Sequence, residues 1–130
     1  MDKVGVMLEY LSEEWIAAAD AALRASGLCS SGGERFVVEQ HVGEVVFHIV
    51  FDGTGARICS GPTVEPTVVF YQERRTAVRI AIGDMSAEEA VLDGEVVFKG
   101  NPMALLAHRD LLDKAEDVFA DLRTRTTWDK

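Results

Sequence analysis

Two β-rich runs separated by the dipeptide Gly43-Glu44 constrain the fold of this chain more than any other feature. The runs are "FVVEQHV", residues 36–42, and "VVFHIVFD", residues 45–52. A Gly-X pair between two such runs is typical of a type II′ hairpin turn. That turn places Val42 opposite Val45, and the resulting register gives the hairpin one nearly all-apolar face. We therefore expect this face to pack against a core.

The two faces of the expected hairpin differ sharply. The inner face carries Phe36, Val38, Gln40, Val42, Val45, Phe47, Ile49 and Phe51, and the outer face carries Val37, Glu39, His41, Val46, His48 and Val50. Glu39 and His48 become cross-strand neighbours, which favours an exposed ion pair over a catalytic pair. Gln40 is the only polar residue on the inner face, where it could bind a polar head group or turn to solvent.

Spacing, caps and breakers predict the other elements. The expected helices span residues 12–25, 72–83, 86–93 and 101–123, and further strands span residues 56–61, 67–71 and 95–99. Ser12, Ser86 and Asn101 are the expected N-caps, and Glu89 completes a capping box with Ser86. In the second helix Val78 and Ile82 should point inward, while Arg74, Arg75 and Arg79 stay in solvent.

The order of these elements predicts the class of fold. A run of strands with the helices grouped around it favours α+β, with helices covering one face of a five-stranded, mainly antiparallel sheet. The 130 residues suit one domain, residues 1–130.

Composition excludes several function classes. The net charge of −9 disfavours nucleic acid and anionic membrane surfaces as partners. Cys29 and Cys59 fit neither a metal clip nor a redox pair, so we expect idle thiols. His41, His48 and His108 are scattered, so neither a metal nor another cofactor is expected. The N-terminus lacks the apolar length of a signal peptide or membrane helix, which predicts a cytoplasmic protein without membrane insertion.

The order of structural residues after Thr67 resembles the sterol carrier protein 2 domain. The matching features are "TVVFY" at residues 67–71, Gly83, Ala90, Gly94, "EVVF" at residues 95–98, Gly100 and Asn101, and "YLSEEW" at residues 10–15 matches the start of that domain. The chain departs from the usual pattern in two places. Thr67 stands where the strand usually begins with Asp, and Gly100-Asn101 replaces Gly-Asp.

The resemblance implies a function and a site. The family has an apolar tunnel between sheet and helices, and some members bind sterols, fatty acids or acyl-CoA without catalytic residues common to the family. It therefore implies non-catalytic binding or transport of a lipid or other hydrophobic molecule. The expected ligand-binding residues are Gln40, Phe47, Ile49, Phe51, Val68, Phe70, Val78, Ile82, Met85, Val91, Leu92, Val96, Phe98, Met103 and Leu106. Apolar periodicity alone would equally predict a solid core.

Two alternatives remain open at this stage. The chain could be an enzyme that acts on a hydrophobic metabolite, either an isomerase or cyclase or a thioesterase. No acid, base or nucleophile is expected on the inner strand face, where only Gln40 is polar. The chain could also be an interaction domain, because Val37, Val46 and Val50 make the outer sheet face apolar enough for a homodimer contact.

Overall fold

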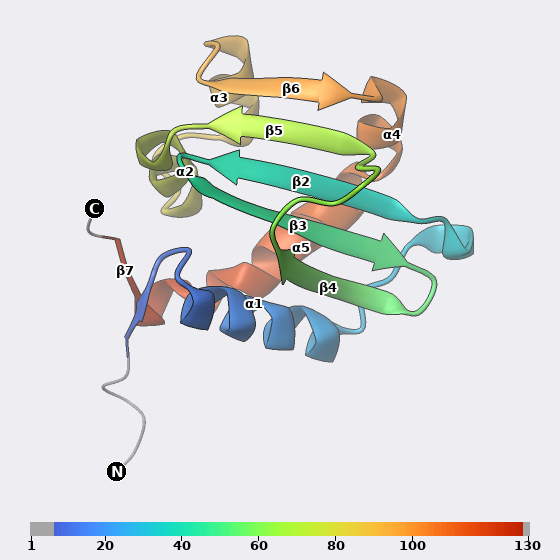
Figure 1. Ribbon diagram of the computed structural model, residues 1–130, viewed down its shortest axis with the longest axis horizontal. Coiled ribbons are helices and arrows are strands. Elements are labelled where there is room, and N and C mark those ends of the chain that lie inside the picture. The colour runs from blue at the N-terminus through green and yellow to red at the C-terminus, as the bar shows by residue number, and fades with distance from the viewer. Residues whose placement is uncertain (1–6, 129–130) are drawn as a thin grey trace.

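A single five-stranded sheet forms the centre of the molecule (Figure 1). The computed structural model describes residues 7–128. The strands are β2 (Phe36–Val42), β3 (Val45–Asp52), β4 (Gly55–Ser60), β5 (Val68–Gln72) and β6 (Val96–Gly100), in the spatial order β4-β3-β2-β5-β6. The predicted α+β class and the five strands are confirmed.

The hairpin has the predicted register. Val42 pairs with Val45, Glu39 with His48, and Phe36 with Phe51. Gly43 has a φ of 60°, while Leu11 is the only non-glycine residue with positive φ within residues 7–128. Positive φ at the first turn residue alone is the mark of a type II′ turn. The apolar face of the hairpin is buried in the core together with residues of α1, as expected.

The sheet is mixed because the chain crosses the hairpin before β5. β2 pairs with β5 in parallel, while the other three strand pairs are antiparallel. Residues 61–67 run across the front of β3 and β2 in Figure 1 and enter β5 from the far end. A parallel neighbour needs such a crossover, so the expected "mainly antiparallel" sheet holds with one parallel pair.

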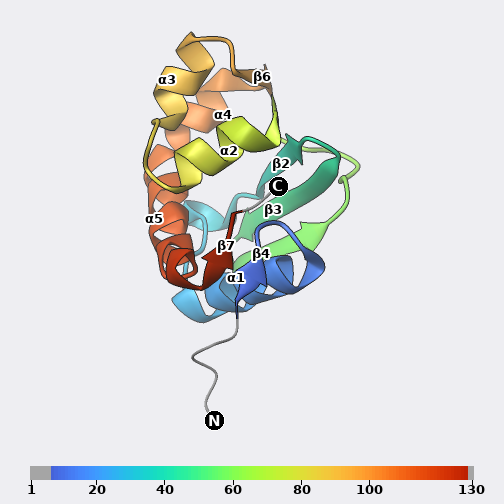
Figure 2. The same cartoon turned by 90° about the vertical axis from the view of Figure 1, so that its left-hand side faces the viewer.

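The five α-helices of the described range lie on the inner side of the sheet (Figure 2). They are α1 (Glu13–Ser26), α2 (Arg74–Ala81), α3 (Ala87–Leu92), α4 (Pro102–Ala107) and α5 (Arg109–Ala120). The predicted caps are confirmed: Ser12, Ser86 and Asn101 each accept backbone N–H groups, and Ser86 forms the full capping box with Glu89. Local capping chemistry therefore sets these helix starts.

The predicted last helix is interrupted at His108. This residue has φ −109° and ψ 20°, which separates α4 from α5. The His108 ring stacks on Phe36 with 4.1 Å between ring centroids, and its Nδ1 lies 2.8 Å from the Ala104 carbonyl oxygen. These two contacts fix His108 in the bend between α4 and α5. The predicted uninterrupted helix to Arg123 was therefore wrong. A 3₁₀ turn, Arg123–Arg125, follows α5.

The predicted faces of α2 need correction. The helix ends at Ala81, so Ile82 lies at its C-cap and is largely exposed, not inward-facing. Thr76 and Ala77 are the buried residues, and Val78 packs partly on the core as expected. Arg74 is not in free solvent: it donates to the Tyr10 carbonyl oxygen at 2.9 Å and lies over the Tyr10 ring.

Buried side chains form two separate clusters. The main cluster joins α1 to the inner sheet face and includes Leu23, Phe36, Phe51 and Val68, all of which are fully buried. The second cluster is small and consists of Met85, Ala90 and Val96, beneath α3. The helix α3 is therefore attached to the molecule through a contact surface of its own.

Segments near both ends of the described chain meet in a short parallel pair that the sequence did not predict. β1 (Leu8–Glu9) pairs with β7 (Thr126–Thr127), and Trp15 Nε1 donates to Thr126 Oγ1 at 3.1 Å. Tyr10 packs against Trp15 and Trp128 at centroid distances of 5.1 and 4.9 Å. These contacts join the start of α1 to the chain beyond α5.

Gly100 lies where β6 passes close to β5, and this proximity generates a test of the fold. Its φ is 121°, and a Cβ would lie 2.5 Å from the Thr67 carbonyl oxygen. We expect Gly100→Ala to lower the free energy of unfolding by more than about 2 kcal/mol. Urea denaturation measures this loss.

The matched control is Gly27→Ala. Gly27 also has positive φ, 79°, but no atom lies near its Cβ position. That variant should lose only about 1 kcal/mol, the cost of the left-handed conformation. Equal losses in the two variants would contradict the close approach of β6 to Thr67.

Candidate functional site

The predicted ligand-binding residues on the central strands lie in the main core. Phe47, Ile49, Phe51 and Val68 are all buried and belong to the main cluster. Gln40 is partly buried, and its Oε1 accepts a hydrogen bond from Gln72 Nε2 at 2.8 Å. The four strand residues are therefore part of the core, with Gln40 beside them.

A second group of predicted residues lies at the boundary between the two clusters. Phe70 and Phe98 are partly buried, with ring centroids 5.5 Å apart, and Phe70 packs on both clusters. Met85 and Val96 are buried in the small cluster. Phe70 therefore connects the inside of α3 with the main core.

The remaining predicted residues are exposed on the helical side. They are Ile82 (47% exposed), Val91 (41%), Leu92 (85%), Met103 (69%) and Leu106 (62%). They come from the end of α2 and from the short helices α3 and α4. The short helices α3 and α4 lie at opposite ends of β6 in Figure 1, and each of them exposes large apolar side chains to water.

A surface hollow of about 390 Å³ separates α3 from α5. Ile80 and Met85 supply its apolar lining, and Glu88 and Arg109 lie on its rim, 2.7 Å apart as an ion pair. Both charged side chains are mostly exposed, and such pairs contribute about 0–1 kcal/mol. Of the hollow's lining, the sequence predicted only Met85.

The far rim of this hollow is charged. Asp113, Glu116 and Arg123 line it from α5 and beyond. Desolvation raises the pKa of Glu116, and the nearby charge of Asp113 raises it further, while Arg123 opposes the shift. A broader hollow at the end of β5 is lined by Glu73, Arg75 and Glu95 and contains none of the predicted ligand residues.

The outer face of the hairpin differs from the prediction. Glu39 is only 7% exposed, and its carboxylate lies 2.6 Å from His41 Nε2 and accepts the Thr63 backbone N–H at 2.9 Å. His48 instead lies with Nδ1 2.8 Å from the Gly61 carbonyl oxygen. The exposed Glu39–His48 ion pair was therefore wrong, although the strand register behind it was right. Residues 61–67 cover these side chains.

The same segment buries two of the three outer valines. Val37 and Val50 are 0% and 3% exposed, and Thr67 exchanges hydrogen bonds with the Val37 backbone. Only Val46 stays partly open. The premise that these valines form a free apolar face was therefore wrong for Val37 and Val50.

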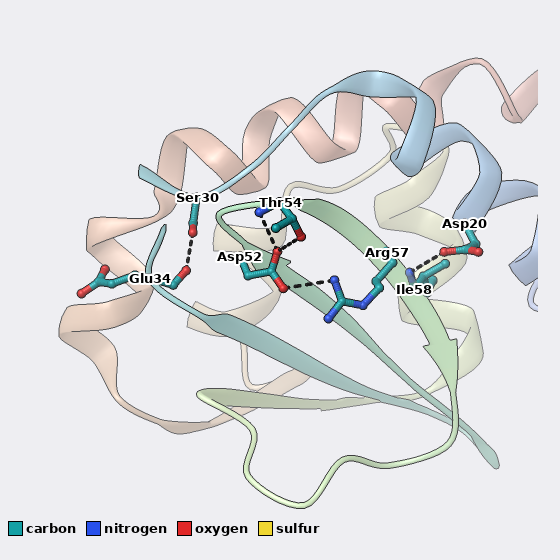
Figure 3. Close-up of polar contacts among 7 residues, drawn as sticks. All are labelled: Asp20, Ser30, Glu34, Asp52, Thr54, Arg57 and Ile58. Carbon is teal, nitrogen blue, oxygen red and sulfur yellow. Dashed lines mark hydrogen bonds and ion pairs between the residues drawn. The ribbon is translucent and has the colours of Figure 1, made fainter. Parts of the chain in front are cut away.

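The other residues considered for catalysis or metal binding take part in turns or are free thiols. Asp52 closes the β3–β4 turn, where it accepts from Thr54 and pairs with Arg57, and these hydrogen bonds lower its pKa to about 2 (Figure 3). Cys29 is exposed and Cys59 partly buried, both as free thiols. Within residues 7–128, no group of His, Cys, Asp and Glu side chains is arranged to hold a metal ion. No helix in that range is long and apolar enough to cross a bilayer.

Comparison with solved structures identifies the architecture. No family model and no curated protein matches the sequence. A crystal structure of sterol carrier protein 2 superposes with a TM-score of 0.65 at 16% identity, covering 87% of this chain and 98% of that one. The chain has the sterol carrier protein 2 fold. The resemblance read from the residues after Thr67 is thus confirmed at the level of the fold.

Two further sterol carrier protein 2-like structures agree. A conserved hypothetical protein of Thermus thermophilus, described as a possible sterol carrier protein, has a TM-score of 0.60 at 17% identity, over 90% of this chain and 92% of that one. Palmitated SCP2L2 of Aedes aegypti has a TM-score of 0.54 at 18% identity, over 82% and 94%.

Glu39 gives this sterol carrier protein 2 fold a predicted pH dependence. Burial alone would raise its pKa, but the Thr63 N–H and His41 hold the pKa below its ordinary value of 4.5. A carboxylate with a depressed folded-state pKa stabilises the fold above its unfolded pKa, and this contribution is lost as pH falls through the folded value. We expect Glu39→Gln to be less stable than wild type at pH 7, with the deficit shrinking below pH 4.5.

Urea denaturation at neutral and acidic pH measures this difference. Glu44→Gln, on the exposed hairpin turn, is the matched control and should follow the wild type at every pH. A Glu39→Gln deficit that stayed constant with pH would show that the Glu39 charge does not stabilise the covering segment.

Proposed function

We propose that this chain is a non-catalytic binding module for a hydrophobic small molecule: a fatty acid, an acyl-CoA or a sterol-like lipid. The fold supports a carrier of this kind, since solved neighbours are sterol carrier proteins. Among these candidates we favour a long acyl chain, because the similar Aedes aegypti protein is described as palmitated.

The exposed apolar side chains on the helical side carry this proposal. Leu92 on α3 and Met103 on α4 are mostly exposed, although both belong to helices that flank the partly buried Phe70 and Phe98. Leaving large apolar side chains in water forgoes the free energy that their burial would give. A hydrophobic ligand that lies against them would remove that apolar surface from water.

The helix α3 is the element best suited to admit such a ligand. It has six residues, rests on the small cluster of Met85, Ala90 and Val96, and is tied to α5 by the exposed Glu88–Arg109 pair. None of these contacts belongs to the main core. Displacement of α3 would therefore expose Phe70 while leaving the hairpin and α1 intact.

The proposed site follows from this displacement. Phe70, Phe98, Met85 and Val96 would contact the ligand from inside, and Val78 would border it. The exposed residues Ile82, Val91, Leu92, Met103 and Leu106 would close over it. Phe47, Ile49, Phe51 and Val68 would form the buried floor, with Gln40 at its edge. Arg109 and Arg123 are the basic groups that line the hollow beside α3, and either could pair with an anionic head group.

The expected affinity is the balance between the free energy of burying methylenes and the cost of association. Each methylene buried contributes about 0.8 kcal/mol, so a chain of about sixteen carbons gains on the order of 12 kcal/mol. Association and ordering cost roughly 4–15 kcal/mol. Affinity then depends on how many methylenes the helices enclose, and little chemical specificity is needed beyond chain length.

The test uses delipidated protein and a fluorescent fatty acid. We expect saturable, reversible binding to wild type, displaced by palmitate, and no turnover of an acyl ester. The double variant Leu92→Ser and Met103→Ser should bind at least about tenfold more weakly, because it removes apolar surface that would cover the ligand. Its free energy of unfolding should change by less than about 0.5 kcal/mol, since both side chains are exposed.

Val64→Ser is the matched control, because Val64 is 95% exposed but lies on the outer face of the sheet. It should bind the fatty acid as wild type does. Unchanged binding in the double variant would remove α3 and α4 from the site. If delipidated wild type bound no fatty acid, acyl-CoA or sterol, the carrier function would be wrong.

A further inference from the structure

The two edge strands of the sheet, β4 and β6, differ in whether another part of the chain covers their outer backbone groups. At the β4 edge, Asp20 of α1 accepts the Ile58 backbone N–H at 2.9 Å through its Oδ1 (Figure 3). Covering an outward N–H with a helix side chain blocks further strand addition. At the other edge, no strand within residues 7–128 pairs with the outer side of β6, and no ribbon crosses it between α3 and α4 in Figure 1.

The hydrogen bonds of β5 show which residues of β6 direct their backbone N–H and C=O groups away from the sheet. The Gln72 carbonyl oxygen accepts the Gly43 N–H at 2.9 Å, so Gln72 points toward β2. Because direction alternates along a strand, Tyr71 points toward β6 and meets Val97. Val96 and Phe98 therefore direct their N–H and C=O groups to the open edge.

We propose that β6 pairs antiparallel with β6 of a second copy of this chain, with Val97 on the twofold axis. In this register the outward groups of Val96 meet those of Phe98 in the other copy, twice by symmetry. Val97, which is 49% exposed on the outer face, then contacts Val97 of the other copy. A pair that is not hydrogen-bonded brings the two side chains close together.

Charge selects this register over its neighbour. With Val97 on the axis, Lys99 stands opposite Glu95 of the second copy, and the same attraction recurs on the other side of the axis. In its own chain Glu95 uses Oε1 to accept a hydrogen bond from Thr76 Oγ1 at 3.1 Å. A twofold axis through Phe98 would instead bring the two Lys99 residues onto neighbouring diagonal positions. Opposite charges across the strands, and one apolar pair between them, favour self-association at this edge.

Substitution at the axis gives a sharp test. Val97→Lys and Val97→Glu each place two like charges opposite one another, so each should raise the dimer dissociation constant about tenfold or more. An equimolar mixture of the two variants places Lys opposite Glu and should form a heterodimer. Val64→Lys makes the same change at a position that is 95% exposed and lies outside the strands of the sheet, and it should leave the dimer unchanged.

Sedimentation velocity over micromolar to submillimolar concentrations measures these states. Concentration-dependent protection of the Val96 and Phe98 amides from hydrogen exchange should accompany dimer formation. A wild type that stays monomeric over that range would overturn the proposal. It would also be overturned if the mixed variants failed to associate, or if Val64→Lys lost the dimer too. Fatty-acid binding should persist in Val97→Lys, so failure here leaves the proposed carrier function standing.

Discussion

The pairing of Val42 with Val45 decides which side chains of β2 and β3 face the helices. A slip of β2 by one residue against β3 would turn Phe36 toward the outer face and bring Glu39 into the core. Fully burying each large apolar side chain stabilises a fold by about 1.5–3 kcal/mol, and several such residues share this face. The crossover to β5, the seat of α1 and the stacking of His108 on Phe36 all depend on this one register.

Local signals explain why so much of the fold was predictable. The hairpin turn, the capping residues Ser12, Ser86 and Asn101, and the breaking glycines act within a few residues of themselves. Apart from the early end of α2 at Ala81, the misses involve partners distant in sequence. The bend at His108 needs Phe36, the burial of Glu39 needs the segment 61–67, and the β1–β7 pair is too short to leave a pattern. None of these three contacts produces a periodic pattern in the sequence that would predict it.

The sequence named the apolar residues of the candidate site, but it did not show which of them are buried and which are exposed. The family resemblance marked apolar residues from Phe47 to Leu106 as ligand-binding, yet apolar periodicity is the same for a side chain in a core and for one that lines a cavity. Phe51 and Leu92 both fitted the pattern, but one is fully buried and the other is 85% exposed. What separates them is the position of the short helices, which depends on few contacts and on no strong local signal. Sequence reasoning therefore found the apolar residues but did not separate the buried residues of the strands from the exposed residues of the short helices.

The contact between Trp15 and Thr126 spans 111 positions of the chain and has a consequence for synthesis. During translation the α1 segment leaves the ribosome long before the chain beyond α5 does. Throughout that interval Tyr10 and Trp15 lack the partners that cover them in the finished protein, and the hairpin must form without them. The nascent chain thus carries an uncovered aromatic surface until residues 119–128 have emerged, and chaperones bind segments of this kind.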